Sequence, residues 1–480
     1  MDEQTRHTEL IVGTTAEAAV VLDGTLDDPD DGSSLGSQRA STPDAVEAAL
    51  VAAEAAWRVG DWSDLPLVER CEALERFAVA LDRRAGEIAW VDAIDSGVPI
   101  AVTRLMGESL GGTVRGAIAT ARGLGEEADL GVDGRRVELL RLPWGPAAIL
   151  TPWNAPAAAA IGKVANALLA GCPAILKPSE QAPSFSTAFA AAALEAGLPP
   201  GAFQIVHGDR EVAAALTGDP RIKAIALIGG QATGRAVAAA AAPRMAALQL
   251  ELGGSNPALV APDAEIEATA EALAEGMTKL NGQWCEAPRR AIVPAALQTD
   301  LVDALEKRLA ALAVGPARSE STEFGPLANR GHLARVGAQV GALGGEARPT
   351  AELPAGEGLF FSPTIVLGAD PAHATEEIFG PVLTILPYGA EAEGLALANA
   401  GDDGLAAYVF GADRERAFAL GTRLHAGEVR IGGTKLIDLV GDSTQSFWGS
   451  SGLGSHGARQ VFEAFRGSRI VGEDDPAIPL

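Results

Sequence analysis

The alternation of apolar and polar segments between residues 146 and 252 predicts a parallel β-sheet. Short, continuous apolar runs are separated by Ala-rich stretches with helical spacing, and several of these stretches end at glycine. Apolar strands that alternate with helices are typical of a parallel sheet covered on both faces. The predicted strands are 147–150, 174–177, 203–206, 224–228 and 247–250, and the predicted helices are 157–169, 185–196, 211–216 and 231–242.

A second alternating series follows Gly253-Gly254 and predicts a second α/β domain. Parallel sheets of this kind bind ligands at the carboxyl ends of their strands, so we expect a nucleotide site near Thr151, Lys177 and Gly229. The predicted strands of the second series are 258–260, 291–293 and 406–410, and its predicted helices are 266–277, 297–311 and 414–424.

The residues before position 146 predict a more varied set of elements. The segment Asp27–Arg39 is rich in Asp, Gly and Ser, which predicts a surface loop. Thr42 and Pro43 supply an N-cap and a first-turn proline for a helix that runs to about Trp57. The other predicted elements are a strand pair within 10–22 and one amphipathic helix over 67–85.

A hairpin pattern interrupts the first domain between residues 128 and 142. Asp133-Gly134 is a favoured two-residue hairpin turn, and the flanking residues alternate in polarity. The hairpin has no apparent core of its own. Such a protruding ribbon is more often a subunit contact than a free edge.

Composition and charge exclude several classes of protein. The chain has 480 residues, of which 48% are hydrophobic and 21% charged, and these values exclude global disorder. Its net charge of −26 repels polyanions, so we expect no nucleic acid partner. The most apolar stretch, 146–176, is broken by prolines and by Lys163, so we expect no membrane span.

The cysteines and histidines are few and scattered. Cys71, Cys172 and Cys285 are widely spaced, which excludes a disulfide scaffold and a thiolate metal cluster and suits the reducing cytosol. The first residues lack the basic and apolar regions of a signal peptide, so we expect a cytoplasmic protein. The six histidines form no ligand pattern, and no metal site is expected.

Several residues could carry chemistry, but each has a plainer interpretation when taken alone. Cys285 could be a buried structural thiol, and Glu251 could be a solvated acid. Asn154 could cap the helix that follows it. The Gly229-x4-Gly234 turn is compatible with a phosphate contact but is not a Gly-x-Gly-x-x-Gly motif.

Together, these segments resemble the NAD(P)-dependent aldehyde dehydrogenase superfamily over essentially the whole chain. The spacing of 34 positions between Glu251 and Cys285 also resembles that family. In chain order, the motifs are Pro152-Trp153-Asn154, Lys177-Pro178-Ser179-Glu180, Gly229 to Gly234, Leu250-Glu251-Leu252-Gly253-Gly254, Gly282-Gln283-Trp284-Cys285 and Glu377-Ile378-Phe379-Gly380-Pro381.

The resemblance implies catalytic roles for Cys285, Asn154 and Glu251. Cys285 would add to the aldehyde as a thiolate, and the Asn154 amide and the Cys285 N–H would stabilise the oxyanion of the thiohemiacetal. Hydride transfer would leave a thioester, which water activated by Glu251, a carboxylate with a raised pKa, would hydrolyse. Acylating relatives lack this glutamate, so Glu251 favours release of a free acid.

The resemblance also implies a dinucleotide site. Lys177 and Glu180 would contact the adenine ribose, and because Glu180 would repel a 2′-phosphate, we expect NAD rather than NADP. Glu377 and Phe379 would hold the nicotinamide ribose and ring. The expected cofactor-binding residues are Thr151, Pro152, Trp153, Lys177, Ser179, Glu180, Gly229, Gly230, Gly234, Leu252, Glu377 and Phe379.

Two segments depart from common family patterns. Gly230-Gln231 stands where the family usually has Ser-Thr, which alters side-chain contacts at the pyrophosphate site. Ser446-Phe447-Trp448-Gly449 stands where Pro-Phe-Gly-Gly is usual, near the mouth of the substrate tunnel.

The tunnel residues predict a bulky substrate. Ala155 and Gly162 stand where many relatives have larger side chains, which favours a bulky aldehyde such as one that contains a ring. Glu286 could instead be a solvated acid. The expected tunnel residues are Ala155, Gly162, Trp284, Glu286, Gly441 and Phe447.

The fold that the resemblance implies is α/β, with two doubly wound parallel-sheet domains and a β-ribbon oligomerisation element. The expected NAD-binding domain is 1–123 and 144–252, and the expected catalytic domain is 253–453. The bridging element would be 124–143 with 454–480. In relatives the ribbon joins the sheet of a neighbouring subunit, so we expect a homodimer or a homotetramer.

Three interpretations of the function stay open at the level of sequence. The first is a hydrolytic, NAD-dependent aldehyde dehydrogenase that acts on a small-molecule aldehyde. The second is an acylating or semialdehyde-specific relative. The third is an inactive aldehyde dehydrogenase scaffold that acts as a binding protein, and the presence of Cys285, Glu251 and Asn154 disfavours it.

Overall fold

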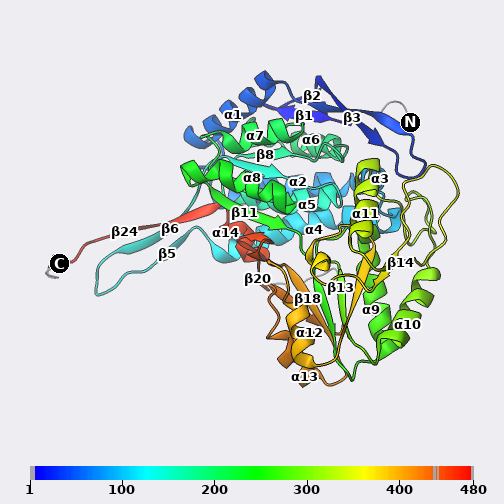
Figure 1. The fold of residues 1–480 in the computed structure, drawn as a ribbon. Coiled ribbons are helices and arrows are strands. Elements are labelled where there is room, and N and C mark those ends of the chain that lie inside the picture. Colours follow the sequence, from blue (N-terminus) through cyan, green and yellow to red (C-terminus); the bar gives the residue numbers. More distant parts are fainter. Residues whose placement is uncertain (1–5, 436–438, 441–442, 477–480) are drawn as a thin grey trace.

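Two large β-sheets form the frame of the molecule, the first above the second in Figure 1. The computed structural model describes residues 6–435, 439–440 and 443–476. The strands of the first sheet, in spatial order, are β2 (Thr14–Glu17), β1 (Thr8–Ile11), β9 (Phe203–Ile205), β8 (Ala174–Lys177), β7 (Ala147–Leu150), β10 (Ala224–Gly229), β11 (Ala247–Leu252) and β22 (Gly452–Leu453).

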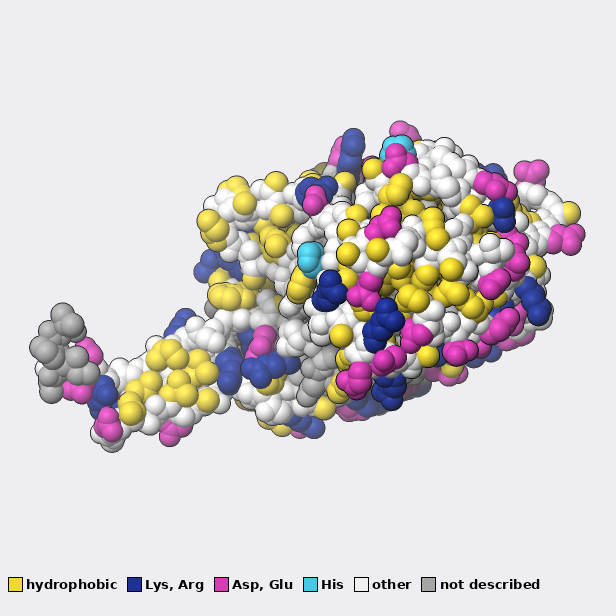
Figure 2. Space-filling model, turned by 60° about the horizontal axis from the view of Figure 1, so that its bottom comes forward, with side chains coloured by type: hydrophobic (Ala, Val, Ile, Leu, Met, Phe, Trp, Pro, Cys, Tyr) yellow, Lys and Arg dark blue, Asp and Glu magenta, His cyan; other side chains and the backbone are white. Residues whose placement is uncertain are grey.

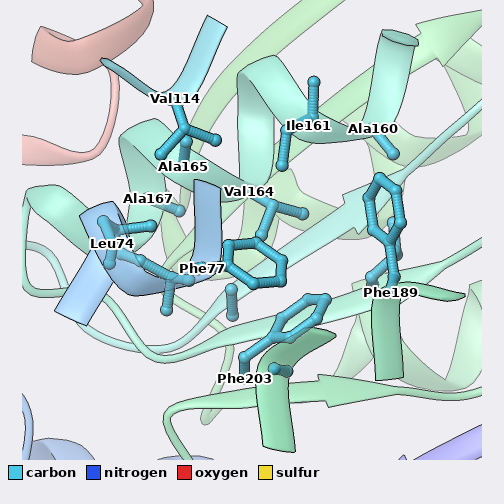
Figure 3. Close-up of a cluster of buried hydrophobic side chains, with 14 of the residues drawn as sticks. Leu74, Phe77, Val114, Ala160, Ile161, Val164, Ala165, Ala167, Phe189 and Phe203 are labelled. Atoms are coloured by element: carbon cyan, nitrogen blue, oxygen red, sulfur yellow. The ribbon is translucent and has the colours of Figure 1, made fainter. Parts of the chain in front are cut away.

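Helices bury both faces of the first sheet because its strands are apolar on both sides. Ala148 packs into one hydrophobic cluster and its neighbour Ile149 into the cluster on the opposite face. Figure 3 shows the Ile149 side, where Phe77, Val164 and Phe203 meet. That face carries α2 (Leu67–Asp82), α3 (Ala85–Ser96), α4 (Ile100–Leu124), α5 (Pro156–Leu169) and α6 (Ser186–Glu195), and the other face carries α1 (Pro43–Arg58), α7 (Arg210–Gly218) and α8 (Gln231–Ala241).

The second sheet repeats this layered arrangement. Its strands are parallel except for the edge strand β14, and in spatial order they are β14 (Glu346–Pro349), β15 (Thr364–Leu367), β16 (Val382–Tyr388), β13 (Arg290–Pro294), β12 (Pro257–Val260), β18 (Ala406–Phe410) and β19 (Glu428–Ile431). One face packs against α9 (Ile266–Thr278) and α10 (Gln298–Ala310), and the other against α11 (Arg330–Ala342), α12 (Glu391–Ala398) and α13 (Arg414–Gly421).

A three-stranded ribbon projects from the body of the molecule (Figure 1). Asp133 and Gly134 both have positive φ, as the predicted hairpin turn requires. The ribbon joins the early hairpin to the end of the chain and consists of β5 (Glu127–Asp129), β6 (Val137–Pro143) and β24 (Arg466–Gly472).

Short elements connect these units. The helix α14 (Ala458–Glu463) packs against α4 and α5. The short strand pairs are β3 (Val20–Asp27) with β4 (Ser34–Ala40), β17 (Asp403–Gly404) with β21 (Trp448–Gly449), and β20 (Gln445–Ser446) with β23 (Ser455–His456). The 3-10 helices are η1 (Ala242–Arg244), η2 (Lys279–Gly282) and η3 (His373–Thr375).

The predicted α/β fold with two sheets and an antiparallel ribbon is confirmed. Both sheets are mixed rather than purely parallel, because β1, β2, β14 and β22 join antiparallel at the edges. The limits predicted for the domains stay a prediction. One detail bears on them, since residues 452–453, assigned to the second domain, pair with β11 of the first sheet.

Two local predictions are wrong. The predicted surface loop Asp27–Arg39 contains most of β4, and the acidic residues Asp28 and Asp30 at its tip are held by Arg318 rather than by water alone. The predicted helix over 67–85 is two helices, because α2 ends at Asp82 and α3 begins at Ala85. The long helix α4 was not predicted, and glycines at five of its positions weaken its helical pattern.

Candidate active site

The predicted site lies where the order of the strands in the first sheet reverses. From β7 the chain passes to β8 and β9 on one side, and then returns to β10 and β11 on the other side. A crevice at the carboxyl ends of the strands is expected at such a point. Thr151 follows β7, Lys177 ends β8, Gly229 ends β10 and Glu251 lies at the end of β11.

Cys285 lies on a loop whose carbonyl groups are all held by side chains. Six consecutive carbonyls, from Gly282 to Ala287, each accept a hydrogen bond from a side chain. The N–H of Cys285 is left beside its own sulfur, where it favours the thiolate. The donors are Arg289 to Gly282 and Trp284, Asn154 to Gln283, Asn256 to Cys285 and Ala287, and Tyr408 to Glu286.

A turn of unusual backbone conformation leads into this loop. Leu280, Asn281 and Gly282 have φ values of 50°, 59° and 77° in succession. The Asn281 side chain stabilises the turn by donating to the carbonyls of Gly97 and Pro326 at 2.7 and 2.8 Å. A Cβ atom at Gly282 would lie 2.2 Å from the Pro381 nitrogen, so glycine is required there.

Cys285, Glu251 and Asn154 line one cavity of about 500 Å³ between the two sheets. The rest of its wall is mainly apolar and built from small side chains of α4 and α5. Its other lining residues are Met106, Thr113, Gly116, Ala117, Pro152, Ala155, Ala158, Ala159, Gly162, Lys163, Asn166, Ile228, Leu280, Trp284, His456, Gly457, Ala458 and Val461.

Glu251 is paired with two basic side chains. Its Oε2 lies 3.5 Å from Lys163 Nζ and 3.5 Å from His456 Nδ1. Burial raises the pKa of Glu251, but the charges of Lys163 and His456 outweigh burial and lower the pKa to about 2. The sequence-based expectation of a raised pKa is therefore wrong for this conformation, because the neighbouring cations come from other segments of the chain.

Cys285 lies in an environment that opposes its ionisation. Burial is the largest effect, and the carboxylates of Glu251, Glu286 and Glu377 add to it, so that the pKa of the thiol is well above its ordinary value. A thiol in this site needs an acceptor for its proton before it can act as a nucleophile.

Asn154 connects the first sheet to the loop of Cys285. Its Nδ2 donates to the Gln283 carbonyl at 2.7 Å, which places the amide two residues from the nucleophile. An amide nitrogen carries two hydrogens, so the second hydrogen can bind another acceptor.

A second cavity, of about 610 Å³, is bordered by Glu377. Burial raises the pKa of Glu377 to about 7 against the lowering effect of Arg289, and its Oε1 is buried without a hydrogen-bond partner. The cavity is lined by Gln231, Arg235, Thr375, Glu376, Glu377, Gly401, Asp402, Asp403 and Ser450.

The rings of Trp153 and Phe379 contact each other, and both contact the ring of His332. The Trp153 ring centroid lies 5.5 Å from that of Phe379 and 4.6 Å from that of His332. The imidazole Nε2 of His332 lies 2.6 Å from the Phe379 carbonyl oxygen. Sequence reasoning assigned no role to His332, because it comes from α11, whose place beside Trp153 only the fold reveals.

The predicted ribose contacts lie at the end of β8. Lys177 is buried and its Nζ lies 3.6 Å from Glu180 Oε2, while it also donates to the carbonyls of Pro178 and Gly208. Burial lowers the pKa of Lys177, and Glu180 opposes that effect. Ser179 is buried beside them, and its Oγ accepts from the Gln181 N–H at 3.2 Å.

The glycine turn after β10 is close to the end of β11. A Cβ atom at Gly234 would lie 2.4 Å from a methyl group of Leu252, whereas one at Gly230 would meet nothing within 4 Å. Gly230 therefore borders open space at the start of α8. Thr151, at the end of the adjacent strand β7, has a buried Oγ1 without a hydrogen-bond partner.

Several predicted positions fall elsewhere than expected. Pro152, predicted to bind cofactor, lines the cavity of Cys285. Glu286 and Phe447, predicted for the tunnel, are absent from the cavity wall that the described residues form. Glu286 is not a solvated acid either, since it accepts from Gln445 at 2.9 Å and burial raises its pKa to about 7. Gly441 lies outside the described residues.

Four further residues of the site were missed by the sequence analysis. Lys163 is a single lysine in an Ala-rich helix, which is a signal that could have identified it. Asn256 and His456 give no such signal, because their partners Cys285 and Glu251 are distant in the chain. Arg289 lies near Gly282 and Trp284 in the chain, but only the folded loop shows that it donates to their carbonyls.

Two mixed, mostly parallel sheets, with helices on both faces and a cavity that holds a thiol, an amide and a carboxylate, are the features of an α/β enzyme. The chain belongs to the aldehyde dehydrogenase family, whose model matches residues 24–471. Its enzymes oxidise aldehydes to acids with NAD(P), and this chain is an oxidoreductase of that type.

Individual relatives are similar over most of the chain. The geranial dehydrogenase of Castellaniella defragrans is 34% identical over 418 residues, which cover 85% of this chain and 86% of that protein. A mutant of aldehyde dehydrogenase C from Pseudomonas syringae, in complex with NAD⁺ and octanal, has a TM-score of 0.88 and 28% identity and covers 97% of this chain and 96% of its own. An NADP dependent enzyme of E. coli has a TM-score of 0.89 and 27% identity, with 98% of both chains covered.

Two further findings concern the described part of the chain. None of its helices has the length and the apolar character needed to cross a membrane. The described residues also hold no group of three or more His, Cys, Asp or Glu side chains arranged to bind a metal ion.

Proposed function

We propose that this enzyme oxidises a bulky, apolar aldehyde to the free carboxylic acid with NAD, using Cys285 as the nucleophile. The observation that carries the proposal is that Cys285, Glu251 and Asn154, from three separate segments, line one cavity. A thiol, an amide donor and a carboxylate are the groups that thioester chemistry followed by hydrolysis requires.

The first half of the reaction forms a thioester. The thiol of Cys285 releases its proton to solvent, and Sγ bonds to the carbonyl carbon. The carbonyl oxygen becomes an oxyanion that the Asn154 amide and the Cys285 N–H stabilise. NAD, when bound, supplies an oxidised nicotinamide that accepts a hydride from the substrate. With the hydride removed, Cys285 would hold the acyl group as a thioester.

The second half releases the acid. Glu251 takes a proton from a water molecule, whose oxygen bonds to the acyl carbon while the bond to Cys285 Sγ breaks. The products are the carboxylic acid and the regenerated Cys285 thiolate. Glu251 lines the cavity of Cys285, which supports this role and disfavours the acylating alternative.

The residues present fit a dinucleotide. Two buried polar atoms, Thr151 Oγ1 and Glu377 Oε1, lack hydrogen-bond partners. This is expected if a bound polar ligand provides those partners. Glu180 places a carboxylate next to Lys177, which favours a free ribose hydroxyl over a 2′-phosphate, and hence NAD over NADP. The residues that would hold the cofactor are Thr151, Trp153, Lys177, Ser179, Glu180, Gly229, Gly230, Gly234, Leu252, Glu377 and Phe379.

The cavity supports a bulky, apolar substrate. Its volume of about 500 Å³ is much more than a two-carbon aldehyde fills, and its walls near Ala155, Gly162 and Trp284 are apolar. At Gly162 a Cβ atom would meet nothing within 4 Å, so the space is open at that point.

The proposal includes a homodimer or homotetramer in the cytoplasm. Figure 2 shows hydrophobic side chains gathered on the face of the ribbon that the view presents, and the ribbon's exposed hydrophobic residues are Leu130, Val132, Ile470 and Val471. A second copy of the chain is the partner that would cover them. The free thiols of Cys71, Cys172 and Cys285 suit a reducing compartment.

The test is an aldehyde panel with NAD or NADP, followed by NADH or NADPH absorbance and by mass analysis of the product. We expect the free acid from the wild type, no turnover from Cys285→Ala, and from Glu251→Gln one burst of NADH that leaves a stable acyl-enzyme. Turnover by Cys285→Ala, or unimpaired steady-state turnover by Glu251→Gln, would contradict the mechanism. A product that forms only with an added thiol acceptor would favour the acylating alternative.

A further inference from the structure

Of the two basic side chains beside Glu251, one is enclosed and the other reaches solvent. Lys163 and His456 both lie 3.5 Å from Glu251 Oε2. The side chain of Lys163 is 4% exposed, that of Glu251 is 14% exposed, and that of His456 is 40% exposed. Of the two partners of Glu251, His456 is therefore the one that can exchange a proton with bulk water.

Lys163 is fixed in place by further hydrogen bonds. Its Nζ donates to Gln249 Oε1 at 3.0 Å, and Gln249 Nε2 donates to the Ser455 carbonyl at 2.7 Å. The same glutamine thus holds both Lys163 and the strand β23 that carries His456. Lys163 fixes the orientation of the Glu251 carboxylate but has no exposed surface through which it could exchange a proton with water.

The charge state of His456 controls how well Glu251 can act as a base. With both neighbours charged, the pKa of Glu251 is about 2, and such a carboxylate holds a proton poorly at neutral pH. Neutralising one of the two cations raises the proton affinity of the carboxylate. Of the two neighbours, the exposed imidazole is the one that can exchange its proton with solvent.

We propose that His456 is a positioning and proton-transfer residue for thioester hydrolysis, and this inference rests on the proposed function of Glu251. As the C–O bond forms and the C–S bond breaks, the proton taken from water moves to Glu251 and then to the neutral imidazole at Nδ1. The imidazolium releases a proton to solvent at its exposed side, which returns both residues to their starting state. No electron is gained or lost in this step.

Other titratable groups face the same place and must be distinguished from His456. Glu286 accepts from Gln445, the residue that pairs with His456 between β20 and β23, and burial raises the pKa of Glu286 to about 7. Glu286 therefore changes charge in the same pH range as an imidazole. The groups around the imidazole are Glu251 of β11, Lys163 of α5, and Cys285 and Glu286 of the nucleophile loop.

The experiment compares the NADH burst and the steady-state rate as functions of pH. In His456→Gln, which retains a polar side chain but cannot titrate, we expect an unchanged burst and a steady-state rate lower by about tenfold, a fraction of a full general-base effect. The wild-type rate should fall in acid as the imidazole becomes charged, and this acid limb should be absent in His456→Gln. Added imidazole should restore turnover to His456→Ala.

Two control variants make the result specific. Glu286→Gln should retain the acid limb, because the limb belongs to His456 in this proposal. His425→Gln alters an exposed histidine outside the cavity and should leave both phases unchanged. The proposal is overturned if His456→Gln keeps the wild-type steady-state rate and acid limb, or if the limb disappears only in Glu286→Gln. Failure of the proposed function itself would appear separately, as absence of an NADH burst in the wild type.

Discussion

At the scale of single residues, the surroundings of Cys285 keep it protonated until it is needed. Three carboxylates act on the thiol, and the guanidinium nearest to the loop, that of Arg289, is already used by carbonyl groups. A thiol that is neutral at rest is protected from oxidation and from unwanted alkylation.

Gly162 sets the width of the substrate cavity. Gly162 lines the cavity, and a Cβ atom there would meet nothing within 4 Å, so the ring of Gly162→Phe would occupy cavity space. We expect kcat/KM for a bulky aromatic aldehyde to fall by at least about tenfold while that for acetaldehyde is retained, because one misplaced group in a pocket costs roughly 1–3 kcal/mol.

The matched control for this variant is Gly112→Phe, which places the same side chain at an exposed position of α4 outside the cavity wall. Steady-state kinetics on the two aldehydes is the measurement. Equal losses for both aldehydes in Gly162→Phe would contradict the assignment of the cavity to the substrate.

Two buried histidines make the fold sensitive to acid. Burial, followed by the charges of Arg39 and Arg6, lowers the pKa of His7 to about 4, and burial followed by His7 lowers that of His207 to about 3. Because the unfolded chain binds these protons near pH 6.5, their neutral forms stabilise the fold fully above pH 6.5, and this contribution is lost as the pH falls toward 4.

We therefore expect the melting temperature of the wild type to decrease more steeply between pH 6.5 and about 4 than that of His207→Gln. Glutamine can still donate to the Thr8 carbonyl, which lies 3.0 Å from His207 Nε2. The exposed His373→Gln is the control and should follow the wild type. Identical slopes for His207→Gln and the wild type would remove His207 from the acid response.

At the scale of elements, the nucleophile loop depends on its contact with the segment before β16. Gly282 approaches the Gly380-Pro381 backbone so closely that a Cβ atom would lie 2.2 Å from the Pro381 nitrogen. The residue before that segment is Phe379, which meets Trp153 of the other sheet. This close contact between Gly282 and Pro381 therefore fixes the position of the Cys285 loop and of Phe379 in the predicted nicotinamide site.

Gly282→Ala should destabilise the protein and reduce activity together. The added methyl group clashes with backbone, and φ is +77°, so we expect a loss of about 1–3 kcal/mol in the free energy of unfolding and a loss of the NADH burst. Gly337→Ala, on the exposed face of α11, should instead be neutral or stabilising. Denaturant melts and burst kinetics measure both effects, and a wild-type burst in Gly282→Ala would contradict the expectation.

At the scale of the whole molecule, the site exists because two sheets and the C-terminal segment meet. Asn154 follows β7 of the first sheet and donates to the loop that precedes β13 of the second. The C-terminal segment adds β22 to the first sheet and brings His456 to Glu251. The same segment then continues into β24 of the ribbon (Figure 1). A short stretch of chain therefore connects His456 of the site to the proposed subunit contact.

The ribbon makes the assembly testable. Ile470 is 58% exposed on β24, and we expect Ile470→Asp to convert the proposed oligomer to a smaller species, because a charge in an apolar contact is costly. Val51→Asp, at a position of α1 that is 52% exposed, is the control and should keep the wild-type mass. Light scattering after size exclusion gives the masses. A monomeric wild type, or an Ile470→Asp variant of unchanged mass, would contradict the assembly.

Local patterns were sufficient for the strands of the two sheets and for the order of the motifs. The predicted bounds of β7, β8 and β18 agree with the structure, because each is a short apolar run bounded by polar residues or by turn residues. Prediction failed where partners are distant. The sequence of β4 is typical of a polar loop, and the segment forms a strand because β3 pairs with it. The helices α2 and α3, predicted as one helix, both pack against α4.

The sequence by itself determined the class of enzyme and the groups that can act, since a thiol, an amide and a carboxylate in family order specify thioester chemistry wherever they are brought together. Tertiary structure alone decided the state of those groups. Residues from β23 and α5 pair with Glu251 and make it a weak base at rest, while buried carboxylates keep Cys285 neutral. Proton affinity depends on burial and on charges within a few ångströms, and neither is a property of a residue's neighbours in sequence.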